Sequence, residues 1–374
     1  MCGICGHIRF DGLCADTQLT RRMMDAMASR GPDAAGMVLR QHAALGHRRL
    51  KIIDLSEKAQ QPMVDSDLGL TIVFNGALYN YRELRATLEN MNYRFFSNGD
   101  TEVILKSYHA WGTECVARFN GMFAFAVLCR DTGRVFLARD RLGIKPLYYL
   151  KTGHDFAFAS FLPALLVHPQ ADTRIDPAAL NYYMTLHAVV PAPHTIFQGI
   201  RKLPPATSMT LDPDGRTRTR RYWQLSFGAR REEKNNTFED WRQKLELELE
   251  AAVRRRLTAD VPVGVLLSGG LDSSLIVALL AAGGQTGLNT FSIGFDTVDE
   301  KKGDEFNYSD LIAETFQTEH HKIRADDVSV LKYLPDAVAA MSEPMVSHDC
   351  IGFYLLSQRV SRHVKVVQSG QGAD

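Results

Sequence analysis

The chain has 374 residues, 45% of them hydrophobic and 23% charged, which is enough apolar material for two globular domains. Lysine plus arginine and aspartate plus glutamate number 43 each, and no apolar run approaches the roughly 20 residues that span a bilayer, so we expect neither nucleic-acid nor membrane binding. The six cysteines are scattered and no secretory signal precedes them, which predicts free thiols in a cytoplasmic protein.

The first part of the chain, residues 2–205, has the pattern of a mixed sheet-and-helix domain. Its apolar residues mostly alternate or form short bounded runs, and helical periodicity interrupts them. We expect strands at 4–10, 70–74, 123–128, 134–138 and 156–159, and helices at 19–28, 81–90 and 101–111. Asp100 stands where a helix cap is expected. A polar stretch then makes residues 206–240 a connecting segment.

Residues 241–374 alternate strands and helices regularly, which predicts βαβ units with a parallel sheet. After a helix at 241–257 we expect strands at 263–267, 290–295, 320–323 and 364–368, and helices at 271–282, 308–316, 328–341 and 352–363. The sequence stops directly after the last strand-to-loop transition, so we expect this domain to be incomplete at its C-terminus.

Two strings carry chemistry, and the first is Met1-Cys2-Gly3-Ile4-Cys5-Gly6. Removing Met1 would leave Cys2 with a free α-amine beside its own thiol, so one residue would supply both nucleophile and general base. A carboxamide substrate also needs an oxyanion hole, for which the backbone and side-chain amides of Asn75-Gly76, after the strand at 70–74, are candidates. Arg49 or Arg48 is a candidate for a substrate carboxylate, and Asp100 for its ammonium.

Each of these signals has a structural alternative when it is taken alone. Cys2 and Cys5 resemble half of a metal site, but no second cysteine pair follows at ligand spacing. Asn75-Gly76 is a common hairpin turn, and Asp100 is an ordinary helix cap. Their joint occurrence favours the catalytic interpretation.

Several longer motifs strengthen it: Met1-Cys2-Gly3-Ile4, Arg30-Gly31-Pro32-Asp33, Gly46-His47-Arg48-Arg49-Leu50, Phe74-Asn75-Gly76, Gly121-Met122-Phe123-Ala124-Phe125 and Arg139-Asp140-Arg141-Leu142-Gly143. Together they resemble the class II glutamine amidotransferase domain, an N-terminal-nucleophile hydrolase with an αββα sandwich. The resemblance makes Cys2 the nucleophile and Asn75 and Gly76 the oxyanion hole. It places glutamine against Arg49, Leu50, Lys51, Ile52, Ile53, Asn75, Gly76, Ala77 and Asp100. The family commonly has glutamate where this chain has Ala77, so Asp100 is expected to hold the substrate ammonium with less help.

The second string, Ser268-Gly269-Gly270-Leu271-Asp272-Ser273, lies between an expected strand and an expected helix. A helix N-terminus with close-fitting glycines favours a bound anion. The loop lacks the lysine of a Walker A motif and resembles the PP-loop of ATP pyrophosphatases, in particular asparagine synthetases. That resemblance implies an ATP site lined by Leu266, Ser268, Gly269, Gly270, Asp272, Ser273, Ile293, Ser369 and Gly370, with Mg²⁺ on Asp272 and Asp374.

One catalytic position of the second domain departs from the family. Many members carry an acidic residue where this chain has Gln371, so the base for ammonia attack is unassigned. Glu343 is one candidate, and a surface salt bridge is the alternative interpretation of that residue.

The two resemblances predict an α/β and α+β protein of two domains: an αββα sandwich over 2–205, then, after the connecting segment, an incomplete PP-loop (adenine nucleotide alpha hydrolase-like) domain over 241–374. They imply a ligase that uses glutamine, ATP and Mg²⁺ to amidate a carboxylate activated as an acyl-adenylate. Loop segments 187–193, 295–308 and 341–350 resemble the N-acetylglutaminylglutamine amidotransferase branch, with aspartate as the alternative acceptor. A glutaminase-only or nucleotide-sensing relative is the alternative of another class, and a homodimer is the expected assembly.

Overall fold

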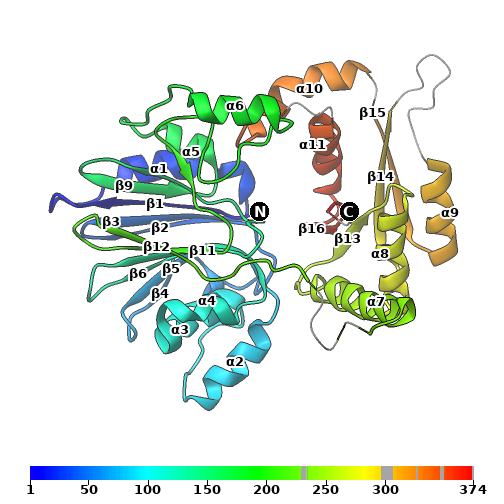
Figure 1. The fold of residues 1–374 in the computed structure, drawn as a ribbon, viewed down its shortest axis with the longest axis horizontal. Coiled ribbons are helices and arrows are strands. Elements are labelled where there is room, and N and C mark those ends of the chain that lie inside the picture. The colour runs from blue at the N-terminus through cyan, green and yellow to red at the C-terminus, as the bar shows by residue number, and fades with distance from the viewer. Residues whose placement is uncertain (229–232, 234, 296–305, 326, 346–348, 373–374) are drawn as a thin grey trace. The chain divides into compact units, whose positions relative to one another are not determined.

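The computed structural model describes the chain except residues 229–232, 234, 296–305, 326, 346–348 and 373–374 (Figure 1). The chain forms two compact units, Met1–Ser226 and Phe227–Asp374. The predicted fold class is confirmed: antiparallel sheets build the first unit and a parallel sheet the second. No helix within the described residues has the length and apolar character needed to cross a membrane.

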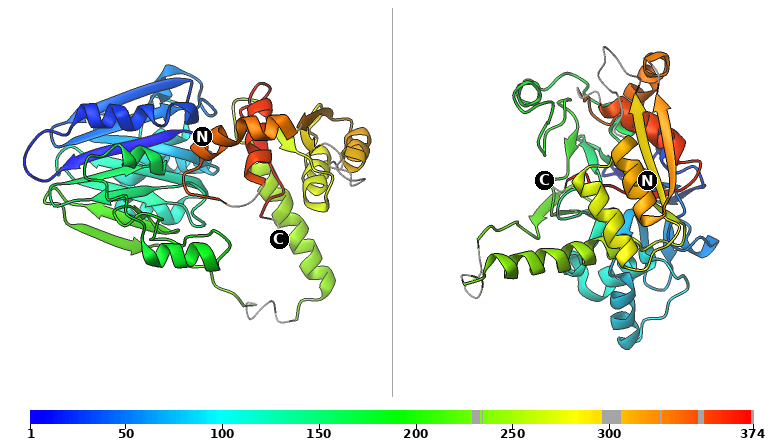
Figure 2. Two further views of the ribbon diagram at one scale, coloured as in Figure 1. Left: turned by 90° about the horizontal axis from the view of Figure 1, so that it is seen from above. Right: turned by 90° about the vertical axis from the view of Figure 1, so that its right-hand side faces the viewer.

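The first unit is a sandwich of two six-stranded antiparallel sheets with helices on its outer faces (Figures 1 and 2). The strand orders are β10-β8-β9-β1-β3-β2 and β12-β11-β7-β6-β5-β4. The strands are β1 (Gly3–Arg9), β2 (Ala34–Arg40), β3 (Ala43–Arg49), β4 (Met63–Asp65), β5 (Leu70–Leu78), β6 (Gly121–Cys129), β7 (Val135–Arg139), β8 (Tyr148–Lys151), β9 (Asp155–Ala159), β10 (Arg201–Lys202), β11 (Thr207–Leu211) and β12 (Thr217–Arg221). The expected connecting segment thus supplies β11 and β12 to the second sheet.

Helices cover each outer face because alternate strand residues point away from the sandwich interior. Side chains of α1 and α5 pack on the first sheet, and those of α2, α3 and α4 on the second. The helices are α1 (Thr17–Asp25), α2 (Tyr81–Asn90), α3 (Asp100–Trp111), α4 (Cys115–Arg118), α5 (Leu162–Leu166) and α6 (Pro177–Thr185), with short 3-10 turns at Ala28–Arg30, Glu57–Ala59 and Gly112–Glu114.

The middle layer between the sheets decides which side chains can meet. It contains Ile4 and Ile8 of β1, Leu45 of β3 and Val73 of β5, all fully or almost fully buried. Because strand side chains alternate with period two, every second residue of these strands faces the same layer. Register in such a buried sheet is strongly specified, since a one-residue slip would invert every side chain.

The described part of the second unit contains a four-stranded parallel sheet, as predicted, and its strand order is β15-β14-β13-β16. Its strands are β13 (Val263–Leu266), β14 (Asn289–Phe295), β15 (Glu319–Ala325) and β16 (Val366–Gln368), and its helices are α7 (Phe238–Arg255), α8 (Leu271–Ala282), α9 (Phe306–Phe316), α10 (Asp327–Ala340) and α11 (Asp349–Val360). Apolar side chains of α7, α8 and α9 gather in one cluster, and those of α10 and α11 in two others. The sheet is therefore covered on both faces, as parallel sheets require.

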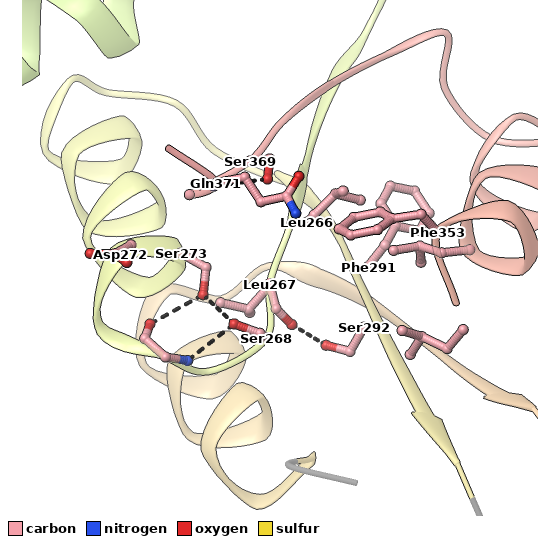
Figure 3. A pocket seen from close by; sticks show the side chains of 14 residues that line it. Leu266, Leu267, Ser268, Asp272, Ser273, Phe291, Ser292, Phe353, Ser369 and Gln371 are labelled. Atoms are coloured by element: carbon pink, nitrogen blue, oxygen red, sulfur yellow. Dashed lines mark hydrogen bonds between the residues drawn. The ribbon is translucent and has the colours of Figure 1, made fainter. Parts of the chain in front are cut away.

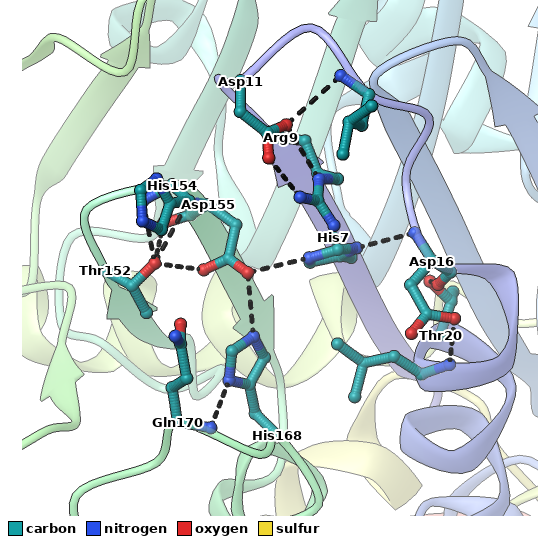
Figure 4. Close-up of polar contacts among 12 residues, drawn as sticks. His7, Arg9, Asp11, Asp16, Thr20, Thr152, His154, Asp155, His168 and Gln170 are labelled. Carbon is teal, nitrogen blue, oxygen red and sulfur yellow. Dashed lines mark hydrogen bonds and ion pairs between the residues drawn. The ribbon is translucent and has the colours of Figure 1, made fainter.

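A buried carboxylate on β9 lies between two histidines, one on β1 and one in the turn after α5 (Figure 4). One oxygen of Asp155 lies 3.2 Å from Nε2 of His7 and 3.2 Å from Nε2 of His168, and the other accepts the Thr152 hydroxyl at 2.6 Å. The Nδ1 atoms accept backbone N–H groups of Asp16 and Gln170.

This His-Asp-His cluster has metal-like spacing, since its ligand atoms lie within 4.8 Å of one another. Its hydrogen bonds argue against a metal. Each Nδ1 accepts an N–H and must be unprotonated, so each neutral ring carries its proton on Nε2 and donates it to Asp155. The hydrogen bonds from His168, His7 and Thr152 outweigh the raising effect of burial, and they hold the pKa of Asp155 far below its usual range. The cluster is a structural clamp.

We predict that Asp155→Ala destabilises the first unit by about 2–5 kcal/mol, because two buried imidazole N–H groups lose their acceptor. Urea unfolding followed by circular dichroism measures the change. The exposed Asp11, which pairs with Arg9, is the matched control, and Asp11→Ala should change the unfolding free energy by less than about 1 kcal/mol. Equal effects of the two substitutions would contradict the clamp.

Candidate active sites

The first candidate site gathers around Cys2, one residue before β1. The backbone N–H of Leu50 lies 3.4 Å from the Cys2 sulfur, and the thiol lies 3.7 Å from the Leu50 carbonyl. Burial raises the pKa of the Cys2 thiol, although the Leu50 hydrogen bond and nearby positive charge partly offset it. The thiol therefore needs a base to become a nucleophile at neutral pH.

The surroundings of the chain terminus favour a neutral amine. Burial lowers the pKa of the Met1 α-amine to about 6, although half of the Met1 surface is exposed. Arg30 and Lys145 add positive charge that lowers it further. This value belongs to the Met1 amine, and an amine with a pKa in this range can accept a proton near neutral pH.

Strand alternation places the Asn75 side chain in the same layer as that of Cys2. Cys2 lies two residues before Ile4 of β1, and Asn75 lies two residues after Val73 of β5. Side chains two residues apart in a strand point to the same side, and Ile4 and Val73 both belong to the middle layer. The beginning of β1 also lies close to this part of β5: Gly3 pairs with Arg48, and the neighbouring His47 bonds the Phe74 carbonyl at 3.1 Å. The alternation therefore predicts that both side chains point toward the layer between the facing sheets.

The Asn75 amide is buried, with 1% of its surface exposed, and its Nδ2 has no hydrogen-bond partner within the described residues. A buried unpaired donor is costly, and such a donor is available to an oxygen of a ligand or of water. Gly76 must be glycine, because a Cβ there would lie 2.2 Å from the Met122 carbonyl oxygen. The expectation that a strand ends at residue 74 is wrong: β5 continues through Leu78, so Asn75-Gly76 is no hairpin turn.

Asp100 lies beside this strand, as the first residue of α3. Its Oδ2 accepts the Leu78 N–H at 3.0 Å, and burial raises the pKa of the carboxyl to about 6. The expected helix-cap role is wrong, because Gly99 occupies the N-cap position and no side chain caps it. The Asp100 carboxylate is thus directed across to the end of β5, next to Ala77.

The structure also separates the two arginine candidates. Arg48 points to the outer face of the sheet that contains β3. There it donates to the Met24 carbonyl and pairs with Asp25 at 2.5 Å. Arg49 is 3% exposed and lies on the same face of β3 as Leu45, the face toward the middle layer. Its positive charge also lowers the pKa of Asp100 against the effect of burial. Only Arg49 faces the candidate site.

The predicted segment after Arg49 forms a tight loop around that guanidinium. Arg49 donates to the carbonyls of Ile53 at 3.5 Å, Ser56 at 3.0 Å and Asp54. Lys51 is occupied elsewhere, since its ammonium pairs with Glu57 at 2.6 Å and its N–H bonds Asp33. Leu50 and Ile52 are half-buried in the same loop.

Lys145 is a site residue that we did not predict. It is buried, its pKa is lowered to about 8 by burial, and it lies near enough to Cys2 for their charges to interact. Arg139 and Asp140 shape the loop that presents it, by bonding the Lys145 carbonyl at 2.8 Å and its N–H at 2.9 Å. The Arg139–Gly143 motif was the available signal, because it ends two residues before this lysine.

The second candidate site is a cavity of about 320 Å³ in the second unit (Figure 3). It opens at the carboxyl ends of β13, β14 and β16, where open parallel sheets bind ligands. The lining residues are Leu266, Leu267, Ser268, Gly270, Asp272, Ser273, Phe291, Ser292, Ile293, Phe353, Leu356, Ser369, Gly370 and Gln371. Every predicted nucleotide-site residue except Gly269 is among them, and Gly269 is the neighbour of two.

Internal hydrogen bonds hold the loop before α8 in one shape. The hydroxyls of Ser268 and Ser273 lie 3.0 Å apart, and Ser273 also bonds the Gly270 carbonyl at 3.1 Å. The closing loop approaches closely, because a Cβ on Gly370 would lie 2.9 Å from Cβ of Asp272. Backbone N–H groups at the start of α8 consequently face the cavity, as an anion site needs.

The described residues provide only one of the two carboxylates expected to bind Mg²⁺. Asp272 offers an exposed carboxylate in the first turn of α8, a hard ligand suited to Mg²⁺. Its predicted partner, Asp374, lies outside the described residues. Gln371 lines the cavity, whereas Glu343 is not among the lining residues.

Comparison with known proteins agrees with the two units. Residues 1–223 match the glutamine amidotransferase domain family, and residues 244–374 match the asparagine synthase family. A Bacillus subtilis protein named asparagine synthetase [glutamine-hydrolyzing] 3 is 34% identical over the whole chain, which spans 62% of that protein's length. A Methanocaldococcus jannaschii protein, putative asparagine synthetase [glutamine-hydrolyzing] 2, is 35% identical, and the chain spans 74% of it. Amidase chry2 of Gibberella zeae is 29% identical, with 58% of its length covered.

We predict that Gly269→Ala weakens the second unit more than a matched glycine substitution does. Gly269 has φ +89°, and a Cβ there would lie 2.6 Å from Cβ of Tyr308. Gly284 has φ +83° with open space around it, so Gly284→Ala carries only the left-handed backbone cost of about 1–2 kcal/mol. Overpacking should add about 1–3 kcal/mol at Gly269, measured by urea unfolding. Equal losses would show that the loop is not packed against α9.

Proposed function

Since this chain belongs to the asparagine synthetase family, with its paired glutamine amidotransferase and asparagine synthase domains, we propose that it is a glutamine-hydrolysing ligase. The first unit would release ammonia from glutamine, and the second would use ATP to activate a carboxylate that ammonia then amidates. The observation that carries the first half is the buried, unpartnered Asn75 amide in the layer that Cys2 faces.

In the proposed first reaction, Met1 has been removed and the α-amine of Cys2 accepts the thiol proton. The sulfur then attacks the carboxamide carbon of glutamine, and the oxygen gains negative charge. Nδ2 of Asn75 and the N–H of Gly76 would stabilise that oxygen, and hydrogen bonds of this kind contribute strongly to the rate of acyl transfer. The proton returns to the leaving nitrogen as ammonia departs, and water then cleaves the thioester to give glutamate.

Glutamine's amino-acid end would be held by two opposite charges. Arg49 suits the α-carboxylate, and ionised Asp100 suits the α-ammonium. Ala77, on the same face of β5 as Asn75, offers no second carboxylate. Asp100 would thus carry the ammonium interaction without the help that a glutamate at position 77 would give.

The asparagine synthase family of the second unit implies ATP use. We propose that the nucleotide lies in the cavity at the carboxyl ends of the strands, with its phosphates on the loop of Ser268 to Ser273 and Mg²⁺ on Asp272 and Asp374. Bound Mg²⁺ would offset phosphate charge while the acceptor carboxylate attacks the α-phosphorus and pyrophosphate leaves. Asp272 would hold the ion, and Ser268 and the N–H groups of α8 would orient the phosphates.

For the acceptor we propose N-acetylglutaminylglutamine, with aspartate as the alternative. The proposal is supported by the residue patterns of the segments at 187–193, 295–308 and 341–350, of which 296–305 and 346–348 lie outside the described residues. An acetylated dipeptide has no ammonium, so it needs no acidic partner, and the neutral Gln371 at the cavity is compatible with that.

Cys2→Ala should reduce glutamine hydrolysis by at least about 1,000-fold, because the substitution removes the nucleophile. The measurement is glutamate release at saturating glutamine. Cys14→Ala, at an exposed cysteine, is the matched control and should keep wild-type rates. Hydrolysis that survives Cys2→Ala would place the nucleophile elsewhere, and equal loss in both variants would indicate a general effect.

The KM for glutamine should rise as the pH falls below about 6, the pKa to which burial raises Asp100. Protonation removes the charge that holds the ammonium, so KM should increase up to about tenfold between pH 6.5 and 5. Asp100→Asn should show a high KM with a flat profile over this range. A wild-type KM that stays constant down to pH 5 would exclude Asp100 as the ammonium ligand.

The acceptor is tested by competition in the full protein encoded by the gene. Equal concentrations of N-acetylglutaminylglutamine and aspartate are supplied with glutamine, ATP and Mg²⁺, and products are identified by mass spectrometry. The amidated dipeptide should dominate, together with stoichiometric pyrophosphate. Asparagine as the main product would overturn the acceptor assignment, and pyrophosphate without any acceptor would favour a nucleotide-sensing relative.

A further inference from the structure

Glutamine's α-carboxylate and α-ammonium are attached to one carbon, so the groups that grip them must be held at a fixed separation. The proposed ligands come from different segments: Arg49 ends β3, and Asp100 begins α3. Strand β3 pairs with β1 and β2, and neither of these pairings includes the turn before α3. The spacing of the two ligands therefore depends on contacts between the loop after β3 and the start of α3.

Asp54 makes that connection. Its side chain is 7% exposed, and its Oδ1 accepts the N–H of Ser56 at 3.1 Å and the Ser56 hydroxyl at 2.6 Å. Its Oδ2 accepts the N–H of Asn98 at 2.7 Å, two residues before Asp100. Both carboxylate oxygens are thus used, one on each segment.

The backbone of Asp54 is committed to the same arrangement. Its φ is +50°, in the left-handed region that few non-glycine residues adopt, although aspartate does so more often than most. The Asp54 carbonyl accepts a hydrogen bond from the Arg49 guanidinium. One residue therefore contacts the substrate-facing arginine through its backbone and the turn before α3 through its side chain.

The packing of Gly99 against Asp54 and the ionised state of Asp54 support the same connection. A Cβ on Gly99, the N-cap of α3, would lie 3.3 Å from Cβ of Asp54, so the two segments touch. Burial raises the pKa of Asp54, but hydrogen bonds from Ser56 and Asn98 and the charge of Arg49 outweigh it, and the net pKa is lowered. At neutral pH the group is a carboxylate, which can accept on both oxygens.

We propose that Asp54 is a positioning residue that sets the separation of Arg49 and Asp100 for glutamine. This inference rests on the proposed glutaminase function. Asp54 would touch no reacting atom, and it would act by holding the loop after β3 against the start of α3. Its loss would weaken binding of substrate and transition state alike, and such a loss raises KM while leaving kcat nearly unchanged.

The test is glutamine hydrolysis by the full chain carrying Asp54→Asn. The asparagine amide has one oxygen and one NH₂, so the N–H of either Ser56 or Asn98 would lose its acceptor. The KM for glutamine should rise about tenfold or more, with kcat within about threefold of wild type. Asp54→Glu restores the carboxylate and should give an intermediate KM. Ser56→Ala, which removes one donor and is the milder change, should raise KM less than Asp54→Asn and serves if that variant folds poorly.

Asp176 supplies the matched control. It is similarly buried at 8% exposure and accepts two backbone N–H groups at the start of α6, but it contacts neither the Arg49 loop nor α3. Asp176→Asn should lower the melting temperature without changing the KM. A KM that rises equally in Asp176→Asn, or that stays unchanged in Asp54→Asn, would overturn the positioning role.

Different outcomes separate this inference from the proposed function. Wild-type hydrolysis with an unchanged KM in Asp54→Asn would reject positioning and leave the glutaminase intact. Protection of Cys2 from iodoacetamide by glutamine gives a second measure of binding, and Asp54→Asn should need about tenfold more glutamine for half protection. A wild-type chain that neither hydrolyses glutamine nor is protected by it would reject the proposed function itself.

Discussion

The first unit depends on the period-two alternation of side chains in two facing sheets. Asn75 of β5 shares the strand face of Val73 in the buried layer between the sheets, and Cys2, one residue before β1, lies two residues from Ile4 of the same layer. Ile4, Leu45 and Val73 are among the buried apolar residues of that layer, so the register of β1 and β5 is fixed by hydrophobic burial. The same burial that holds the sheets raises the pKa of Cys2 and leaves the Asn75 amide unpaired. The packing that stabilises the first unit therefore also positions the candidate reactive groups.

The candidate site of the second unit lies in loops at one edge of a parallel sheet. Parallel strands place their carboxyl ends along one edge, and loops rather than strand faces carry the polar groups. Here the loop of Ser268 to Ser273 is closed by its own hydroxyls, and Gly370 brings the last described loop against it. Two unrelated sheet architectures thus present their candidate sites in different ways: between sheets in the first unit and beyond a sheet edge in the second.

Many elements were predictable because they are bounded apolar runs, as in β6 and α8, or because their apolar residues alternate, as in β14. Strands β2, β3, β4, β8 and β10 were not predicted from the sequence, and β11 and β12 were placed in a connecting segment. The places of β3 and β11 in their sheets come from pairing with β1 and β7, which lie far away in the chain. The end of β5 was misjudged for a local reason: Asn75-Gly76 has turn chemistry, but tertiary packing against Met122 keeps it extended. Lys145 had only an indirect signal, the Arg139–Gly143 motif just before it, and Asp54 had none, since each gains its surroundings only from what the fold brings next to it.

The central claim is that Cys2 is the group that meets glutamine's carboxamide in the layer shared with Asn75. The most direct measurement is labelling of the chain with a chloroketone analogue of glutamine, followed by peptide mass spectrometry. The account predicts one adduct, on an N-terminal Cys2 without Met1, and a labelling rate that falls when glutamine is added. An adduct on Cys5 or Cys14, or labelling of Cys2 that glutamine does not slow, would contradict it.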